Sequence, residues 1–142
     1  MLEIAMIILV AEDEALIALV LELTLRPAGH RVVGPAATSE EALRLAEQTN
    51  PELALVDIDL HDGDDGIALA RTLRERYGTP SLFLSGQVPR ALANKDAALG
   101  LIRKPYDPES VLGAVAYVGE LMSGRSPGRV PPQLELFREL HG

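Results

Sequence analysis

The stretch "LALVDIDLHDGDDG", residues 53–66, begins as an unbroken apolar run and ends in a cluster of aspartates. Its apolar part, residues 53–56, is typical of a strand buried on both faces, as in a parallel sheet covered by helices. The five aspartates that follow stand within nine positions, at 57, 59, 62, 64 and 65. Because like charges at this spacing repel each other, the crowding indicates a structural or chemical role for some of these carboxylates.

The rest of the chain repeats the same pattern of a short apolar run followed by a helical stretch. Strands are predicted at residues 7–11, 31–34, 53–56, 81–84 and 101–103, and helices at about 14–27, 39–49, 65–77, 88–98 and 108–122. Five βα units in this order predict an α/β domain with an open, doubly wound parallel sheet and right-handed crossovers. Ligands of such sheets bind at the carboxyl ends of the strands.

The composition changes after the predicted domain, which spans residues 1–122. Residues 123–133, "SGRSPGRVPPQ", are rich in Pro, Gly and Ser and are typical of a linker. Beyond them, Leu134, Phe137 and Leu140 recur at helical spacing. We interpret residues 123–142 as a linker and a short amphipathic segment that packs on its own domain or on a second copy.

Charge and composition exclude several classes of function. A net charge of -8 without a Lys/Arg cluster argues against nucleic-acid binding. The absence of cysteine excludes disulfides, thiolate catalysis and cysteine-based zinc sites. The apolar run at residues 4–10 is too short to span a membrane and leads directly into acidic residues, so we expect a cytoplasmic protein that does not bind membranes.

Chemically capable side chains follow four of the five predicted strands. They are Glu12 and Asp13 after the first strand, Asp57 after the third, Ser85 after the fourth and Lys104 after the fifth. Because the carboxyl ends of parallel strands meet at one edge of the sheet, we expect these groups to converge. Three clustered carboxylates repel each other unless a divalent cation lies among them, and oxygen ligands at an open cleft suit Mg²⁺.

Such a cluster is suited to phosphoryl transfer onto a carboxylate. Mg²⁺ and Lys104 would neutralise an incoming phosphoryl group, and the Ser85 hydroxyl could donate a hydrogen bond to one of its oxygens. Asp57 stands at the tip of a central strand and is the predicted nucleophile.

Four motifs together resemble the receiver domain of two-component response regulators, including the chemotaxis regulators and some stand-alone receivers. They are "ILVAEDE" at 8–14, "LALVDIDL" at 53–60, "LFLSG" at 82–86 and "IRKPYDPESVLGAV" at 102–115. The resemblance is colinear over about residues 6–122. It implies a flavodoxin-like (βα)5 fold whose five-stranded parallel sheet has the order 2-1-3-4-5.

The resemblance also implies a role for each matching residue. Asp57 would accept a phosphoryl group from the phosphohistidine of a sensor histidine kinase or a histidine phosphotransfer protein. Glu12 and Asp13 would hold Mg²⁺, with Asp13 as the direct ligand, and the backbone carbonyl of Asp59 would be a further ligand. Such a protein catalyses only its own phosphorylation and dephosphorylation and is not an enzyme with an external substrate.

Further consequences of the resemblance concern the switch. Lys104 is expected to precede a cis bond to Pro105, and phosphorylation to shift the face formed by the fourth and fifth helices between two states. Leu101 stands where many receivers carry a switch aromatic, and His61 where a proline is frequent. We expect no DNA-binding helix-turn-helix after residue 122, so the chain is either a single-domain response regulator or a receiver whose output domain is absent from it. Output through an unknown downstream protein is expected, from a monomer or a phosphorylation-sensitive homodimer.

Three other interpretations compete with this one. The Asp57-x-Asp59 pair also resembles haloacid-dehalogenase phosphatases, but those carry it on their first strand. An EF-hand loop beginning at Asp57 would need Gly at the position of Asp62 and Glu at that of Ala68. A receiver-like binding module that is never phosphorylated would lack the aspartate or the lysine, and neither is missing.

The first predicted helix is apolar nearly all round, more than one buried face requires. We expect four of its residues to face the sheet, namely Leu16, Leu19, Val20 and Leu23. Ile17 and Leu21 would then remain outside. One interpretation is that these two residues simply widen the stripe that faces the core. The other, which the resemblance implies, is that they contact the helical, histidine-bearing domain of the kinase.

Overall fold

The computed structural model describes residues 4–60 and 63–137. Its strands are β1 (Ile7–Ala11), β2 (Arg31–Ala36), β3 (Leu53–Asp57), β4 (Ser81–Ser85), β5 (Gly100–Arg103) and β6 (Leu134–Leu136). Its helices are α1 (Ala15–Leu25), α2 (Ser39–Thr49), α3 (Gly66–Tyr77), α4 (Val88–Leu92) and α5 (Pro108–Met122). The predicted α2 and α5 coincide with the observed helices.

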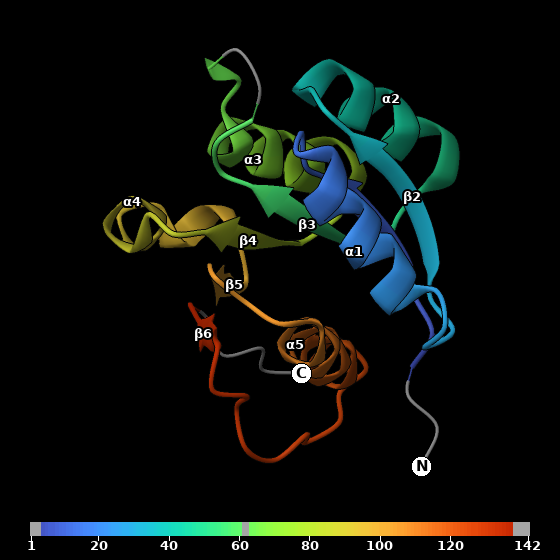
Figure 1. Cartoon of the computed structure of the whole chain (residues 1–142), viewed down its shortest axis with the longest axis vertical. Helices are drawn as coiled ribbons and strands as arrows, with labels where there is room; N and C mark the ends of the chain where they lie inside the picture. Colours follow the sequence, from blue (N-terminus) through green and yellow to red (C-terminus); the bar gives the residue numbers. More distant parts are fainter. Residues whose placement is uncertain (1–3, 61–62, 138–142) are drawn as a thin grey trace.

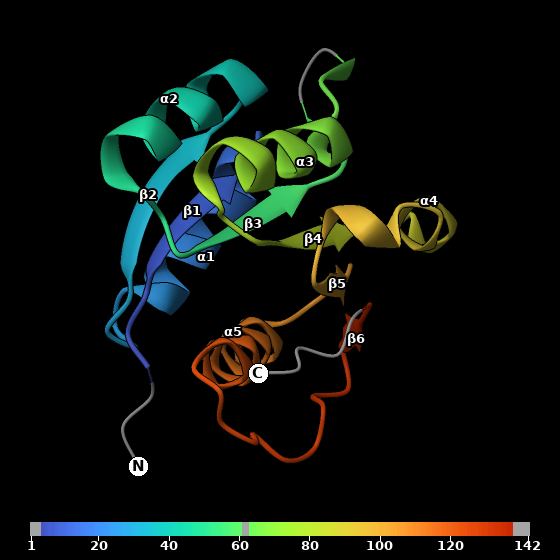
Figure 2. The same cartoon turned by 180° about the vertical axis from the view of Figure 1, so that it is seen from behind.

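One sheet of order β2-β1-β3-β4-β5-β6 forms the centre of the molecule. Strands β1 to β5 are parallel, and β6 joins β5 antiparallel. Helices α1 and α5 cover one face, and α2 and α3 cover the other (Figures 1 and 2). The doubly wound flavodoxin-like fold and the order 2-1-3-4-5 are therefore confirmed, while the predicted count of five strands was wrong by one.

The apolar strands form the core because their side chains alternate between the two helical layers. In β3, Leu55 packs on the side of α1 and α5, whereas Val56 packs on the side of α2 and α3. All five residues of β3 and of β4 are buried. Because β3 and β4 are parallel and fully buried, their carboxyl ends and the polar residues there are held in place side by side.

The fourth helix is shorter than the sequence predicts. Helix α4 ends at Leu92, and the rest of the predicted span contains a 3-10 turn, Lys95–Ala97. Two side chains of this stretch bind Arg71 of α3, Asn94 at 2.9 Å and Asp96 at 2.6 Å. These contacts hold the chain against α3.

The buried face of α1 is the opposite of the predicted one. Ala18, Leu21 and Leu25 are buried, and Ile17 packs against the same core. The four residues expected inside, Leu16, Leu19, Val20 and Leu23, are instead exposed. A helix that is apolar nearly all round gives no periodic signal to tell its two faces apart.

The C-terminal segment forms a strand where its spacing predicts a helix. Leu134 packs into the core beside α5, and Phe137 packs with the cluster around Phe83 on the other face of the sheet. Residues three apart lie on opposite faces of a strand but on one side of a helix, so the spacing alone was ambiguous. The segment packs on its own domain, which is one of the two arrangements considered above. Leu140 lies outside the described residues.

Strand β2, at the outer edge of the sheet, is irregular. Its register with β1 shifts between Leu9 and Ala11, opposite Gly34 and the cis-bonded Pro35. Gly34 has a φ of 99°, and a Cβ there would lie 2.8 Å from the carbonyl oxygen of Val10. Glycine is therefore required at this position.

Candidate functional site

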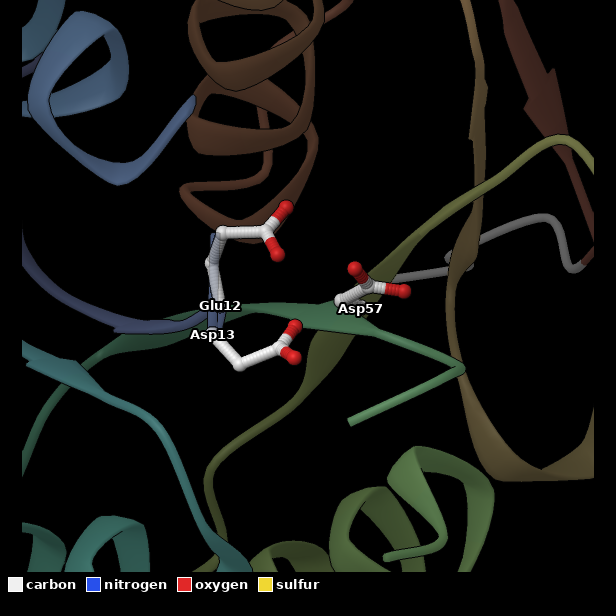
Figure 3. Close-up of side chains that lie close together, drawn as sticks. All are labelled: Glu12, Asp13 and Asp57. Carbon is white, nitrogen blue, oxygen red and sulfur yellow. The ribbon is translucent and has the colours of Figure 1, made fainter. Parts of the chain in front are cut away.

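Three carboxylates converge at the carboxyl ends of β1 and β3. Glu12 and Asp13 directly follow β1, and Asp57 is the last residue of the neighbouring β3. One oxygen of each of the three groups lies within 4.8 Å of the others. Figure 3 shows the side chains turned toward a shared space. Glu12 and Asp57 are buried, whereas Asp13 is partly exposed.

Lys104 brings a positive charge to this cluster from the end of β5. Its Nζ atom lies 2.9 Å from Oδ2 of Asp57 and 3.5 Å from Oε1 of Glu12. Its backbone N–H donates to the carbonyl oxygen of Ser85 at 3.0 Å, which ties the ends of β4 and β5 together. The bond from Lys104 to Pro105 is cis, as the resemblance implied.

The other oxygen of Asp57 and the hydroxyl of Ser85 are held by backbone amides. Asp57 Oδ1 accepts the N–H of Asp59 at 2.9 Å. Ser85 is buried, and its Oγ accepts the N–H of Gln87 at 2.8 Å. Ser85 is one residue beyond Leu84, the register partner of Asp57, so β4 places its hydroxyl at the same edge of the sheet.

The crowding of charge changes the protonation of this cluster. Burial raises the pKa of Glu12 to about 8, and the hydrogen bond and charge of Asp57 add to the effect. Burial opposes the charge of Lys104, but its hydrogen bond with Asp57 and the charges of both carboxylates outweigh that effect and raise the pKa of Lys104. Lys104 is thus shared by two of the three acidic groups, Glu12 and Asp57.

The cluster fits a divalent cation. Oxygens of all three carboxyl groups lie close together, and the Lys104 ammonium contacts only two of these groups, Glu12 and Asp57, among the described residues. Carboxylate oxygens are the hard ligands that Mg²⁺ takes in proteins. Asp13, the least buried of the three, borders solvent, where a metal that keeps several waters needs room.

The side chain of Asp59 accepts hydrogen bonds from two residues that follow β4, Gln87 and Arg90. Gln87 Nε2 donates to its Oδ2 at 2.5 Å, and Arg90 of α4 donates to its Oδ1 at 2.8 Å. The same Arg90 also contacts Asp65 at 3.3 Å. Sequence reasoning missed Arg90, because it lies 31 positions from Asp59 and follows no strand.

The remaining described aspartates of the acidic stretch stabilise the loop. Asp64 accepts the N–H and the hydroxyl of Ser39, at 2.5 and 2.8 Å, and so joins the loop to α2. Asp65 caps α3 by accepting the N–H of Ile67 at 2.9 Å. His61 and Asp62 lie outside the described residues.

An apolar groove of about 490 Å³ borders the site. It is lined by Leu16, Ile17 and Val20 of α1 and by Lys104, Pro105 and Tyr106. Burial, followed by the charges of Glu12 and Asp57, raises the pKa of Tyr106 above its ordinary value. The groove extends from the exposed apolar face of α1 to Lys104, which contacts Asp57.

The family model of the response regulator receiver domain matches residues 8–116. The chain belongs to this family. The phyllosphere-induced regulator PhyR of Methylorubrum extorquens is 36% identical to this receiver over 111 residues, which are 77% of the chain and 42% of PhyR. The transcriptional regulatory protein PdtaR of Mycobacterium tuberculosis is 33% identical over 111 residues, 76% of the chain and 54% of PdtaR. The receiver thus spans about half the length of these curated relatives.

Solved structures show the same fold. A putative response regulator from Chloroflexus aurantiacus has a TM-score of 0.73 at 30% identity, over 82% of this receiver and 98% of that chain. The response regulator PhyR from Brucella abortus has a TM-score of 0.67 at 34% identity, over 75% of this receiver and 44% of that chain. Within residues 4–60 and 63–137, no helix of the receiver has both the length and the apolarity to cross a bilayer.

Proposed function

We propose that the chain is a cytoplasmic, phosphorylation-dependent signalling switch that accepts a phosphoryl group on Asp57 in the presence of Mg²⁺. The donor would be the phosphohistidine of a sensor histidine kinase or a histidine phosphotransfer protein. The observation that carries this proposal is the buried Asp57 carboxylate with Lys104 at 2.9 Å and two further carboxylates within 4.8 Å. Membership of the receiver family supports it.

In the proposed reaction, a carboxylate oxygen of Asp57 attacks phosphorus while the bond from phosphorus to the imidazole nitrogen breaks. The electron pair of that bond leaves with the imidazole, and an acyl phosphate forms on Asp57. Lys104 follows the negative charge from the carboxylate to the phosphoryl oxygens. The Ser85 hydroxyl, which already accepts the Gln87 amide, keeps its own hydrogen to donate to one of these oxygens.

Glu12, Asp13 and Asp57 would hold the metal, with the backbone carbonyl of Asp59 as a further ligand. When bound, Mg²⁺ would supply the positive charge that offsets the phosphoryl oxygens. The amide of Asp59, which donates to Asp57 Oδ1, fixes the orientation of the carboxylate for attack.

The exposed apolar face of α1 is the proposed contact for the phosphodonor. Leu16 and Val20 line the groove that also contains Lys104, the residue bonded to Asp57. A helical domain that packs on this face would therefore bring its phosphohistidine to the edge of the sheet where Asp57 ends β3. Output would pass to a downstream protein, with the receiver as a monomer or a phosphorylation-sensitive homodimer.

Phosphorylation can be tested with small donors. The protein is incubated with Mg²⁺ and either acetyl phosphate or phosphoramidate, whose P–N bond resembles that of phosphohistidine, and its intact mass is measured. We expect the wild type and the control Asp96→Asn to gain one phosphoryl group and Asp57→Asn to gain none. Labelling of Asp57→Asn, or no labelling of the wild type with either donor, would overturn the proposal. The latter result would favour the receiver-like binding module.

A further inference from the structure

The C-terminal strand covers the edge of the strand that carries Lys104. In the antiparallel register of β5 and β6, Leu101 lies opposite Glu135 and Ile102 lies opposite Leu134. The contact extends beyond β6, where the N–H of Phe137 donates to the carbonyl oxygen of Leu99 at 2.8 Å. Without β6, the buried strand β5 would present a row of unpaired backbone groups.

Aromatic packing fixes the far end of this strand. The ring of Phe137 lies 6.2 Å from the ring of Phe83, with the ring planes tilted by 59°. Both belong to the cluster that contains Leu101. The C-terminal segment therefore supplies an aromatic side chain beside Leu101.

Gly100 makes the close approach of the two strands possible. A Cβ atom at this position would lie 2.5 Å from the carbonyl oxygen of Glu135 and 3.3 Å from Cα of Leu136. Backbone atoms this close cannot move aside cheaply, so any side chain on Gly100 displaces β6. The β5 sequence is thus adapted to hold the C-terminal strand.

The strand is joined to the phosphoacceptor site through two adjacent residues. Arg103 contacts Glu135 by an ion pair, and its N–H donates to the carbonyl oxygen of Gln133 at 3.3 Å, the long end of the hydrogen-bond range. The next residue, Lys104, donates a hydrogen bond to Asp57. Arg103 therefore links Lys104 along the chain to this long backbone contact between β5 and the C-terminal segment.

We propose that residues 133–137, here called the strap, are released from β5 when Asp57 is phosphorylated. This inference rests on the proposed function. A phosphoryl group on Asp57 places its negative charge beyond the present carboxylate, and Lys104 follows it. Arg103 then shifts with Lys104, and the strap loses the Gln133 hydrogen bond and the Glu135 ion pair. The freed edge of β5 and the apolar surface around Leu101 become available to an extended segment of a partner.

Hydrogen exchange tests the release directly. Exchange of backbone amides is followed by mass spectrometry in the protein with Mg²⁺, before and after phosphorylation by acetyl phosphate, and the intact mass reports the phosphorylated fraction. We expect phosphorylation to remove the protection of the Phe137 and Arg103 amides and to leave β1 and β3 protected. Asp57→Asn should show no change.

The two possible failures can be told apart. Phosphorylated protein that keeps full protection of the strap overturns the strap proposal and leaves the proposed function standing. A protein that gains no phosphoryl group refutes the proposed function, and the strap proposal falls with it.

Variants of the strap provide a reciprocal test. If phosphorylation releases the strap, a weakened strap favours phosphorylation to the same degree. We expect Phe137→Ala and Gly100→Ala to lose strap protection before phosphorylation and to raise phosphorylation at limiting acetyl phosphate by about fivefold. Glu135→Gln, which removes only the ion pair, should show a smaller change in the same direction. Met122→Ala, at an exposed apolar side chain of α5, is the control. The coupling between strap and phosphorylation would be contradicted if Glu135→Gln lost strap protection but was phosphorylated to the same extent as the wild type.

Discussion

The ammonium of Lys104 lies 2.9 Å from Oδ2 of Asp57, although 47 positions separate the two residues in the sequence. The Asp57 side chain is 5% exposed and that of Lys104 is 25% exposed, so the carboxylate is buried while the ammonium keeps partial access to water. The same ammonium also contacts Glu12. Lys104 is therefore the shared counter-ion of Asp57 and Glu12.

Replacing Lys104 by methionine should destabilise the protein. The buried Asp57 would lose its cation, which costs about 2 kcal/mol, less than for a fully buried pair because Lys104 is partly exposed. Urea unfolding without metal measures the loss, and Mg²⁺ should restore part of it because the ion replaces the missing charge. Unchanged stability in metal-free buffer would show that the remaining carboxylates are protonated in the variant.

The binding of Mg²⁺ should strengthen as the pH rises. The pKa of Glu12 is about 8 in the metal-free protein, so below that pH the metal must displace a proton. The affinity should rise by at most about tenfold per pH unit up to about pH 8 and then level off. Calorimetric titrations at several pH values measure this slope, and Glu12→Gln should flatten it.

The same titration affects stability with the opposite sign. Without metal, folded Glu12 retains a proton that the unfolded chain, in which a glutamate has its ordinary pKa of 4.5, releases. This contribution to stability is fully present below pH 4.5 and is lost as the pH rises through about 8. The raised pKa would be contradicted if the stability of the metal-free wild type increased from pH 4.5 to about 8 while that of Glu12→Gln decreased.

Leu16→Glu should slow phosphotransfer from a protein donor without affecting small donors. Leu16 is 74% exposed and lines the groove beside Lys104, so a charge there disturbs the proposed contact but not the core. We expect phosphotransfer from a phosphorylated histidine phosphotransfer protein to slow by about tenfold or more. The reaction with phosphoramidate should keep its rate; equal slowing of both reactions would place the effect in the site itself.

Gly66→Ala should disrupt the end of β3. A Cβ at Gly66 would lie 2.1 Å from the carbonyl oxygen of Asp57, so α3 would have to move away from the phosphoacceptor. We expect a loss of about 3 kcal/mol or more in unfolding free energy. Gly113→Ala is the matched control, because its Cβ would approach only Pro131, at 3.8 Å, and should leave stability equal or higher. Similar unfolding curves for both variants would refute the expectation.

The order and type of the strands β1 to β5 and the helices α1 to α5 followed from the sequence, because buried parallel strands and helices have distinct patterns. The face of α1 did not, since its residues are apolar nearly all round. The strand β6 did not either, because it consists of three residues and exists only through its pairing with β5. Contacts between Arg71 and Asp96, which accompany the early end of α4, join residues 25 positions apart and leave no local signal.

The convergence of Glu12, Asp13, Asp57, Ser85 and Lys104 on one sheet edge was predictable because each directly follows or ends a parallel strand. Their detailed partners were not. The amides of Asp59 and Gln87 bind Asp57 Oδ1 and Ser85 Oγ, and Arg90 reaches Asp59 beside the site from a helix. Such contacts depend on how loops and helices pack, which no spacing along the chain encodes.

The break at Gly34–Pro35 has a consequence for the behaviour of the protein at high concentration. Pro35 lacks an N–H, and the register of β2 shifts beside it, so a strand from a neighbouring molecule cannot form a continuous ladder on this edge. The opposite edge of the sheet is β6 itself, a strand of three residues. With the strap in place, the sheet therefore ends in an irregular strand on one side and a three-residue strand on the other. Short and irregular edge strands disfavour edge-to-edge pairing, so we expect self-association of the resting protein to favour helical surfaces.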